Sequence, residues 1–116
     1  MTRFALLTHD HPTPHLDLLL ESAGVLRTWR LTDWPPSGVT ISAEPLPDHR
    51  RLYLDYEGPV SGNRGTVARI DGGPCEWIED QPEHLRVRLV GRERHGLAVL
   101  SRDADGRWAL TWLADR

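Results

Sequence analysis

The stretch "HLDLLLE", residues 15–21, decides the fold, because its leucines suit either a helix or a strand. Leucine is a good helix former, so a helix over residues 15–24 is the competing interpretation. As a strand, the stretch places its three even-numbered leucines on one face and its polar residues, with Leu19, on the other. Nine prolines scattered along the chain disfavour long helices. We therefore predict a strand whose leucine face packs in the core.

The rest of the chain repeats a pattern of short apolar segments separated by turns. Turn signals include "DWPPSG" at residues 33–38, "DGGP" at 71–74 and "DADG" at 103–106. The segments between them are rich in β-branched, leucine and aromatic residues, and "HLRVRLV" at 84–90 alternates cleanly. Such spacing is typical of a sandwich or barrel. The sequence predicts a mainly β protein, a small closed or partly open antiparallel β-barrel with little helix.

The composition limits the class of protein. A chain of 116 residues fits one domain, so we expect a single domain over residues 1–116. With 39% hydrophobic residues, 27% charged residues and a net charge of −3, it is predicted to be soluble and globular. No apolar run approaches the roughly 18 residues of a membrane span, and the opening "MTRFALLTHD" is too short and too polar for a secretory signal. We expect a cytoplasmic location and no membrane partner.

Cysteine is scarce and lysine is absent. The single Cys75 excludes an internal disulfide and any multi-cysteine metal site. All 14 basic residues are arginines, which excludes Schiff-base catalysis and a P-loop lysine. A mildly acidic total argues against tight nonspecific binding of duplex nucleic acid, which needs many cationic contacts. It leaves room for a small site that takes one nucleic-acid end.

The polar face of residues 15–21 carries candidate metal ligands. His15 and Asp17 lie one side-chain repeat apart on the predicted strand, and His9 precedes a proline-rich bend that could fold it back beside His15. Two imidazoles and one carboxylate with open coordination positions suit Mn²⁺, Fe²⁺ or Zn²⁺. The alternative is a solvent-exposed strand end with scattered histidines, and spacing alone leaves both open. His11 is either a further ligand or phosphate contact, or a solvated loop histidine.

A second polar cluster lies in "PDHRRLYLDYEG", residues 47–58. On a regular strand, one face would carry the odd-numbered polar residues His49, Arg51, Tyr53, Asp55 and Glu57. A histidine and a tyrosine near a metal can grip a phosphate or protonate a leaving oxygen. The alternative is an amphipathic strand with a wet face, in which the acidic residues hold turns and pair with arginines.

These two clusters, in this order, resemble the 3′-phosphoesterase domain family of bacterial DNA ligase D. The first family signature, approximately "HDxxxxHxDLRLE", is matched by "HDHPTPHLDLLLE" at residues 9–21. The second, approximately "DHPLxYxDFEG", is matched by "DHRRLYLDYEG" at residues 48–58, and "SGNRGTV" follows at 61–67. The similarity runs from about Phe4 to Leu113, which is nearly the whole chain.

The resemblance implies a compact β-barrel with a polar pocket, a bound Mn²⁺ or another divalent transition metal, and repair of DNA 3′ ends. The family removes a terminal ribonucleoside and then the remaining 3′-phosphate. Its metal ligands fall on His9, His15 and Asp17, and its catalytic histidine and tyrosine fall on His49 and Tyr53. The implied partners are nucleic-acid 3′ ends or a small phosphate ester, and ligase or polymerase repair proteins are candidate protein partners.

Three positions depart from the family pattern. Leu19 stands where the signature has arginine, Asp33 aligns near a family lysine, and Pro47 replaces an acidic residue. Leucine cannot grip a phosphate with two hydrogen bonds as a guanidinium does. The second hypothesis is therefore a catalytically degenerate barrel that binds a metal, a nucleic-acid end or a protein. Three arginines are candidates to compensate: Arg30, Arg51 and Arg64.

The tryptophans and Glu21 each have two interpretations. Five tryptophans could stack on bases, but core packing is the preferred interpretation for a small β domain. Trp34, in a turn, is the best candidate for stacking. Glu21 either anchors a ligand histidine from behind or is an exposed acid at the strand end.

Overall fold

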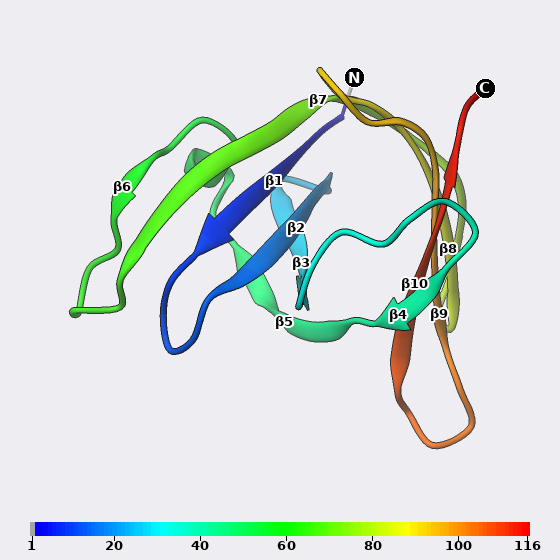
Figure 1. Cartoon of the computed structure of the whole chain (residues 1–116), viewed down its shortest axis with the longest axis horizontal. Coiled ribbons are helices and arrows are strands. Elements are labelled where there is room, and N and C mark those ends of the chain that lie inside the picture. Colours follow the sequence, from blue (N-terminus) through cyan, green and yellow to red (C-terminus); the bar gives the residue numbers. More distant parts are fainter. Residues whose placement is uncertain (1) are drawn as a thin grey trace.

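The computed structural model describes residues 2–116, and its regular secondary structure is antiparallel strands apart from one short 3₁₀ helix (Figure 1). The first five strands are β1 (Arg3–His9), β2 (His15–Ser22), β3 (Val25–Leu31), β4 (Thr40–Ser42) and β5 (Glu44–His49). After a short 3₁₀ helix, η1 (Arg51–Leu54), come β6 (Gly58–Pro59), β7 (Thr66–Gln81), β8 (His84–Val90), β9 (His95–Arg102) and β10 (Trp108–Ala114). Nothing in the described range is a helix long and apolar enough to cross a bilayer. The predicted β fold is confirmed, and residues 15–21 form a strand.

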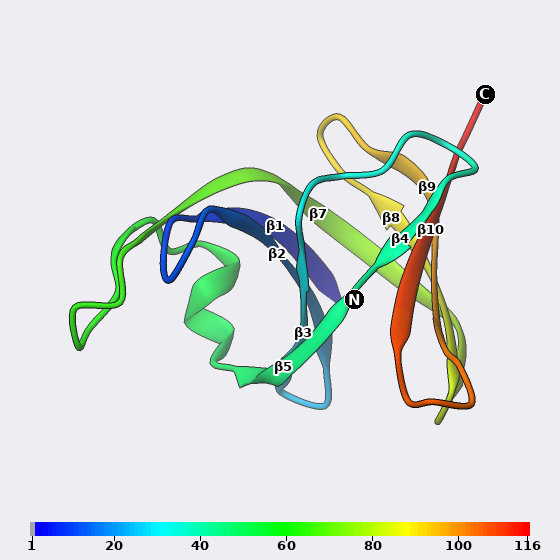
Figure 2. The ribbon, with the colours of Figure 1, turned by 60° about the horizontal axis from the view of Figure 1, so that its bottom comes forward.

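The strands form one ten-stranded sheet that curls on itself. Its order is β4-β10-β9-β8-β7-β1-β2-β3-β5, and β6 pairs with β7. The two edge strands follow one another in the chain, with β4 pairing with β10 and β5 pairing with β3. Figure 2 shows β4 and β5 crossing the open side in succession. The fold is therefore a partly open barrel, within the predicted class.

The longest strand, β7, serves both halves of the barrel. Its first half pairs with β1 and its second half with β8. It bends through residues 71–74, where Gly73 has φ +154° and an added Cβ would collide with the carbonyl oxygen of Val90. The turn predicted at this "DGGP" is wrong, because these residues keep pairing with β1 while the glycines bend the strand.

Both faces of β2 are buried. Its leucine face, as predicted, packs in the main core, which includes Leu16, Leu18, Leu20 and Trp29. The opposite face meets a second, smaller core of apolar residues, which we call the minor core: Ala5, Leu7, Leu19, Leu26, Leu54 and Val67. Burying one leucine side chain contributes about 1.5–3 kcal/mol, so β2 is fixed from two sides. The polar residues of β2 are therefore held on a rigid element.

Residues 47–58 do not form the predicted strand. β5 ends at His49, and η1 then turns the chain. A strand would place Tyr53 and Leu54 on opposite faces, whereas both pack against the minor core. Burial of Leu54 against distant parts of the chain outweighs the local alternation that the sequence displays.

Two polar residues of this segment form ion pairs with residues of β1 and β2. The Nε atom of Arg51 lies 2.9 Å from Glu21 Oε2. Arg3 donates two hydrogen bonds to Asp55, of 2.6 and 3.2 Å, and this pairing holds the pKa of the Asp55 carboxyl below its usual range. Asp55 thus pairs with arginine as predicted, whereas Arg51 pairs with Glu21 and does not share the predicted face with His49 and Tyr53.

The tryptophans pack in and around the main core. Trp29 and Trp112 are buried, and the other three are partly buried against the same core. Trp34 is half-buried rather than exposed, and its ring meets that of Trp112 edge-on at 5.2 Å between centroids. The preferred interpretation of the tryptophans as packing residues is confirmed.

Candidate metal centre

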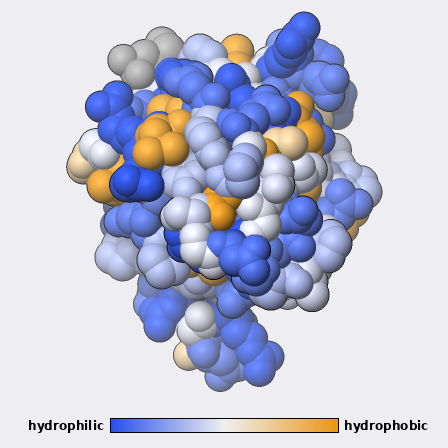
Figure 3. Space-filling model, turned by 90° about the vertical axis from the view of Figure 1, so that its left-hand side faces the viewer, coloured by the Kyte–Doolittle hydropathy of each residue, from blue (hydrophilic) through white to orange (hydrophobic). Residues whose placement is uncertain are grey.

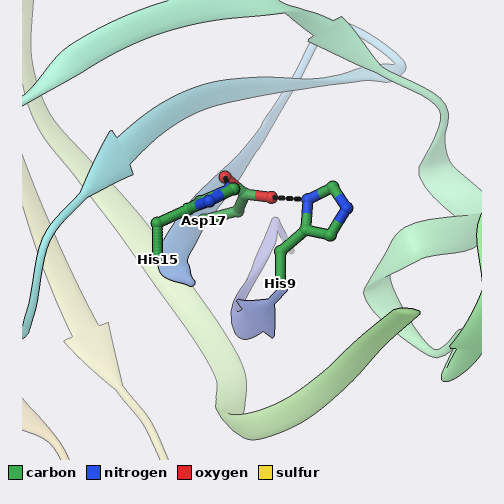
Figure 4. A group of neighbouring side chains, drawn as sticks. All are labelled: His9, His15 and Asp17. Carbon is green, nitrogen blue, oxygen red and sulfur yellow. Dashed lines mark hydrogen bonds and ion pairs between the residues drawn. The ribbon is translucent and has the colours of Figure 1, made fainter. Parts of the chain in front are cut away.

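The hairpin of β1 and β2 brings the three predicted metal ligands together. His9, the last residue of β1, pairs directly with His15, the first residue of β2. Asp17 lies two residues further along β2, on the same face. The centroids of the two imidazole rings are 4.9 Å apart. Figure 4 shows both rings turned toward the carboxylate.

The three side chains are close together and nearly enclosed. His9 Nδ1 lies 3.2 Å from Asp17 Oδ2, and His15 Nε2 lies 3.1 Å from Asp17 Oδ1. One ligand atom from each residue lies within 4.8 Å of the other two. The exposed fractions of the side chains are 15% for His9, 4% for His15 and 3% for Asp17. The alternative of a solvent-exposed strand end is therefore wrong.

Backbone carbonyls determine which nitrogen of each ring carries hydrogen. His15 Nδ1 lies 2.7 Å from the carbonyl oxygen of Thr13, and His9 Nε2 lies 2.8 Å from that of Arg64. A carbonyl oxygen only accepts, so we assign the hydrogens to these two nitrogens. In neutral imidazoles, the lone pairs of His9 Nδ1 and His15 Nε2 then face the carboxylate of Asp17.

Two loops hold these carbonyls in place. The loop between β6 and β7 is tied to the β1–β2 loop by a 2.7 Å hydrogen bond from the backbone N–H of Thr66 to Asp10 Oδ1. Gly65, with φ +80°, allows this approach, because a Cβ there would collide with the Asp10 carboxylate. The carbonyl of Arg64 thereby stays beside His9. Sequence reasoning missed both carbonyls, since a backbone acceptor leaves no mark on residue identity.

The donor set fits a divalent transition metal. His15 Nε2 and Asp17 Oδ1 are buried and, among the described residues, have no hydrogen-bond partner. Lone pairs that face an anionic oxygen across about 3 Å repel unless a cation or proton lies between them. Two imidazole nitrogens and one carboxylate form a ligand set that suits Mn²⁺, Fe²⁺ or Zn²⁺. In metal sites, a histidine ligand commonly donates its other ring N–H to a backbone carbonyl, which fixes the orientation of the ring. His9 and His15 both have such a carbonyl partner.

His49 and Tyr53 form a second cluster of side chains. His49 Nδ1 lies 2.9 Å from the carbonyl oxygen of Pro47 and 3.2 Å from Thr28 Oγ1. The carbonyl assigns a hydrogen to Nδ1, so Nε2 is the ring nitrogen left for a ligand. The rings of His49 and Tyr53 meet edge-on at 5.7 Å. The residues remain neighbours although the segment is a turn and not a strand.

A cavity of about 410 Å³ joins the two clusters. His9 and Asp17 line it together with His49 and Tyr53. Its remaining lining includes three arginines, one further carboxylate and several apolar side chains: Arg30, Arg50, Arg64, Asp48, Leu7, Leu46 and Val67. Figure 3 shows that the side of the molecule bearing the β6–β7 loop is mostly hydrophilic, with apolar groups in small separate spots. Because both arginines and apolar side chains line the cavity, it can hold an anionic group that also carries an apolar part.

Comparison with known proteins assigns the family. The chain matches the family model "DNA Ligase D 3'-phosphoesterase domain" over residues 7–110. It belongs to this family. The "Multifunctional non-homologous end joining DNA repair protein LigD" of Mycobacterium tuberculosis is 29% identical over 114 residues, which cover 90% of this chain and 15% of that protein. The "Multifunctional non-homologous end joining protein LigD" of Pseudomonas aeruginosa is 28% identical over 106 residues, which cover 83% and 13%. The chain thus spans a small part of the length of these relatives.

The departures from the phosphoesterase signature have distinct structural settings. Leu19, where the signature has arginine, is fully buried in the minor core. Asp33 accepts a 2.8 Å hydrogen bond from the backbone N–H of Trp34. Pro47, which replaces an acidic residue, supplies the carbonyl that holds His49. On β2, a fully buried apolar side chain therefore stands two residues after Asp17, at the position where the signature has a cation.

Two further predicted roles have different outcomes. Glu21 is buried, and it accepts a 2.9 Å hydrogen bond from the backbone N–H of Arg3 while it pairs with Arg51. Both interpretations of Glu21, as an anchor for a ligand histidine and as an exposed acid, are therefore wrong. His11 is exposed and lines the cavity, with its ring centroid 6.5 Å from that of His9.

Proposed function

We propose that the chain is a metal-dependent phosphoesterase that acts on the 3′ ends of nucleic acids and removes a 3′-phosphate or a 3′-ribonucleoside. The proposal rests chiefly on the buried convergence of His9, His15 and Asp17 beside a cavity that three arginines line. Membership of the 3′-phosphoesterase family supports it. Both relatives' names refer to non-homologous end joining, and that of the Mycobacterium tuberculosis protein also to DNA repair, which favours DNA ends as the substrate.

The chain's residues have separate proposed tasks in this reaction. His9, His15 and Asp17 would hold the metal, for which Mn²⁺ is our first choice, with the two rings oriented by carbonyls. A bound divalent ion polarises a phosphoryl oxygen and lowers the pKa of a bound water. His49, whose Nδ1–H donates to the carbonyl oxygen of Pro47, would act as an imidazolium: its Nε2–H would donate to a phosphate oxygen, or pass its proton to the leaving oxygen and leave a neutral ring with hydrogen on Nδ1. Tyr53 would orient the phosphate through its hydroxyl.

The proposal also includes the domain organisation, the location and the partners of the protein. It treats residues 1–116 as one domain, of which Met1 lies outside the described residues. It places the protein in the cytoplasm, where a 3′-hydroxyl produced here would serve a ligase or polymerase as a partner in repair.

The test is release of phosphate from an oligonucleotide with a 3′-phosphate in the presence of Mn²⁺. His15→Ala removes one proposed ligand and is expected to abolish turnover. His84→Ala is the matched control, because His84 lies on β8 and pairs with Glu79, away from the cavity. Wild-type turnover no greater than that of His15→Ala, on this substrate and on several other phosphate esters, would reject the enzyme.

The second candidate function is a binding barrel without turnover. The buried Leu19 favours it, because an apolar side chain packed in the minor core stands where the family signature has a cation. Removing one preorganised charge-stabilising group costs about 10²–10³ in rate. Binding of Mn²⁺ and of a 3′-phosphorylated oligonucleotide, without hydrolysis, is the result expected for this candidate. Measurable wild-type turnover counts against it.

A further inference from the structure

Arg30 lies beside the candidate metal centre on the neighbouring strand. The strand registers pair Leu7 with Asp17, Asp17 with Arg30, and Arg30 with Glu44. Directly opposed residues of antiparallel strands project to the same face of the sheet. Arg30 therefore shares the face of Asp17, and its side chain lines the same cavity.

The guanidinium of Arg30 has unused hydrogen-bonding capacity. Its Nε is buried without a hydrogen-bond partner among the described residues. Its Nη1 lies 3.6 Å from Glu44 Oε2, which is too long for a hydrogen bond, and the Glu44 side chain is mostly exposed. A guanidinium carries five N–H donors that match the oxygens of a phosphate. Arg30 is therefore a cation with donors available beside the metal ligands.

The other arginines near the cavity are less suitable. Arg64 donates to the carbonyl oxygen of Ser61 at 2.6 Å and to its hydroxyl at 3.1 Å. Arg51 pairs with Glu21 and does not line the cavity. Arg50 lines the cavity but is exposed, so water competes for its donors. Arg30 is the half-buried member of the group.

Sheet geometry places Arg30 no farther from Asp17 than residue 19. Two residues along one strand span about 6.8 Å, whereas adjacent strands lie about 4.8 Å apart. A cation on β3 opposite Asp17 can therefore reach the same bound group as a cation two positions along β2. The absence of a cation at position 19 therefore does not by itself argue against anion binding in this cavity.

We propose that Arg30 is the phosphate-binding residue of this cavity and grips the non-bridging oxygens of a phosphate held beside His9, His15 and Asp17. The inference deepens the proposed function and rests on it for the identity of the substrate. Anion binding by Arg30 can nevertheless be measured without turnover. The exposed Glu44 carboxylate competes for the same guanidinium, so it weakens phosphate binding.

The test compares Arg30→Gln with Arg107→Gln in the full chain with Mn²⁺ bound. Arg107 lies just before β10, outside the cavity, and gives the same change of charge. Calorimetric titration with inorganic phosphate should show affinity reduced about 10–100-fold in Arg30→Gln, the range for charge-assisted hydrogen bonds, and unchanged in Arg107→Gln. Arg30→Lys should retain part of the affinity. Glu44→Gln should strengthen phosphate binding up to about fivefold.

Measurements of Mn²⁺ affinity and of turnover distinguish failure of this inference from failure of the proposed function. Loss of phosphate affinity in Arg30→Gln with unchanged Mn²⁺ affinity supports the inference, whether or not the wild type hydrolyses an ester. Wild-type turnover that survives in Arg30→Gln with unaltered phosphate affinity overturns the inference and leaves the proposed function standing. A parallel loss of Mn²⁺ affinity would also overturn it, because Arg30 would then act only through Asp17. A wild type that holds Mn²⁺ but neither binds phosphate nor turns over rejects both proposals.

Discussion

Two buried aspartates, Asp17 on β2 and Asp71 on β7, have opposite hydrogen-bonding environments. Asp71 accepts backbone N–H groups from Gly72 at 2.8 Å, Arg92 at 2.7 Å, Glu93 at 3.4 Å and Arg94 at 2.9 Å. It also accepts a 3.2 Å hydrogen bond from Arg94 Nη1. Asp17 is similarly buried, but one of its oxygens has no hydrogen-bond partner and both face imidazole nitrogens.

The contrast separates a structural carboxylate from a candidate ligand. A buried charge is stable when donors surround it, as they surround Asp71, and such a group fixes the loop between β8 and β9. A buried carboxylate that faces two lone pairs is stable only with a cation or protons beside it. Burial alone therefore does not identify the functional aspartate, whereas the supply of donors does. The same substitution at the two positions should thus give opposite results.

Asp71→Asn should have the largest effect on stability. The amide nitrogen of asparagine would face N–H donors, and the paired charge of Arg94 would lose its partner. Breaking a buried pair in this way costs about 3–5 kcal/mol of the free energy of unfolding, measured by urea denaturation. Mn²⁺ affinity of the folded protein should not change.

Asp103→Asn is the control for this substitution. Asp103 also accepts two backbone N–H groups in a turn, at 2.9 Å each, but it is exposed. Its loss should cost much less, because water replaces the missing acceptor. Equal losses of unfolding free energy in the two variants would show that the buried donors around Asp71 stabilise the protein no more than those of an exposed turn.

Mn²⁺ should stabilise the protein through Asp17. A ligand that binds only the folded state adds about 2.7 kcal/mol to the free energy of unfolding at a concentration of 100 times its Kd. The increase should be present in the wild type and in Asp71→Asn, and absent in Asp17→Asn. Thermal denaturation with a Mn²⁺ titration measures it. Full stabilisation of Asp17→Asn would exclude Asp17 as a ligand.

Acid should weaken the protein through Asp71. Burial raises the pKa of Asp71, but the hydrogen bonds from Gly72, Arg92 and Arg94 outweigh it, so the pKa lies below its usual range. An aspartate with a lowered pKa in the folded state stabilises the protein fully above the unfolded value of about 3.9. This stability is lost as the pH falls from there through the folded pKa. Urea midpoints between pH 5 and pH 2 should fall for the wild type and fall less steeply for Asp71→Asn.

The sequence was sufficient for the elements whose pattern is local. Alternation in residues 15–21 predicted β2 without knowledge of distant contacts. That the two polar clusters lie in one pocket was implied by the family resemblance and not by the local pattern. Burial of the β2 face that carries Leu19 was harder to predict, because it depends on the minor core, which brings together residues from distant parts of the chain.

Features set by long-range backbone contacts could not be predicted. Residues 51–54 alternate like a strand, and only the burial of Leu54 in the minor core accounts for η1. Asp71 belongs to a "DGGP" that predicts a turn, yet three of its four backbone donors come from a loop about twenty residues later. Hydrogen bonds to backbone groups depend on where the chain passes and not on which side chains it carries.

Asp17→Asn without metal should have the smallest effect of all. Asparagine has nearly the shape of aspartate, and its amide can donate to the lone pair of His15 Nε2 while its oxygen stays beside His9. A hydrogen bond then replaces a repulsive contact, so the free energy of unfolding in the presence of a chelator should change by less than about 1 kcal/mol and rise if it changes. Urea denaturation of both proteins after treatment with EDTA measures this difference. A loss as large as that of Asp71→Asn would show that Asp17 is a structural carboxylate, and the distinction between the two aspartates would fail.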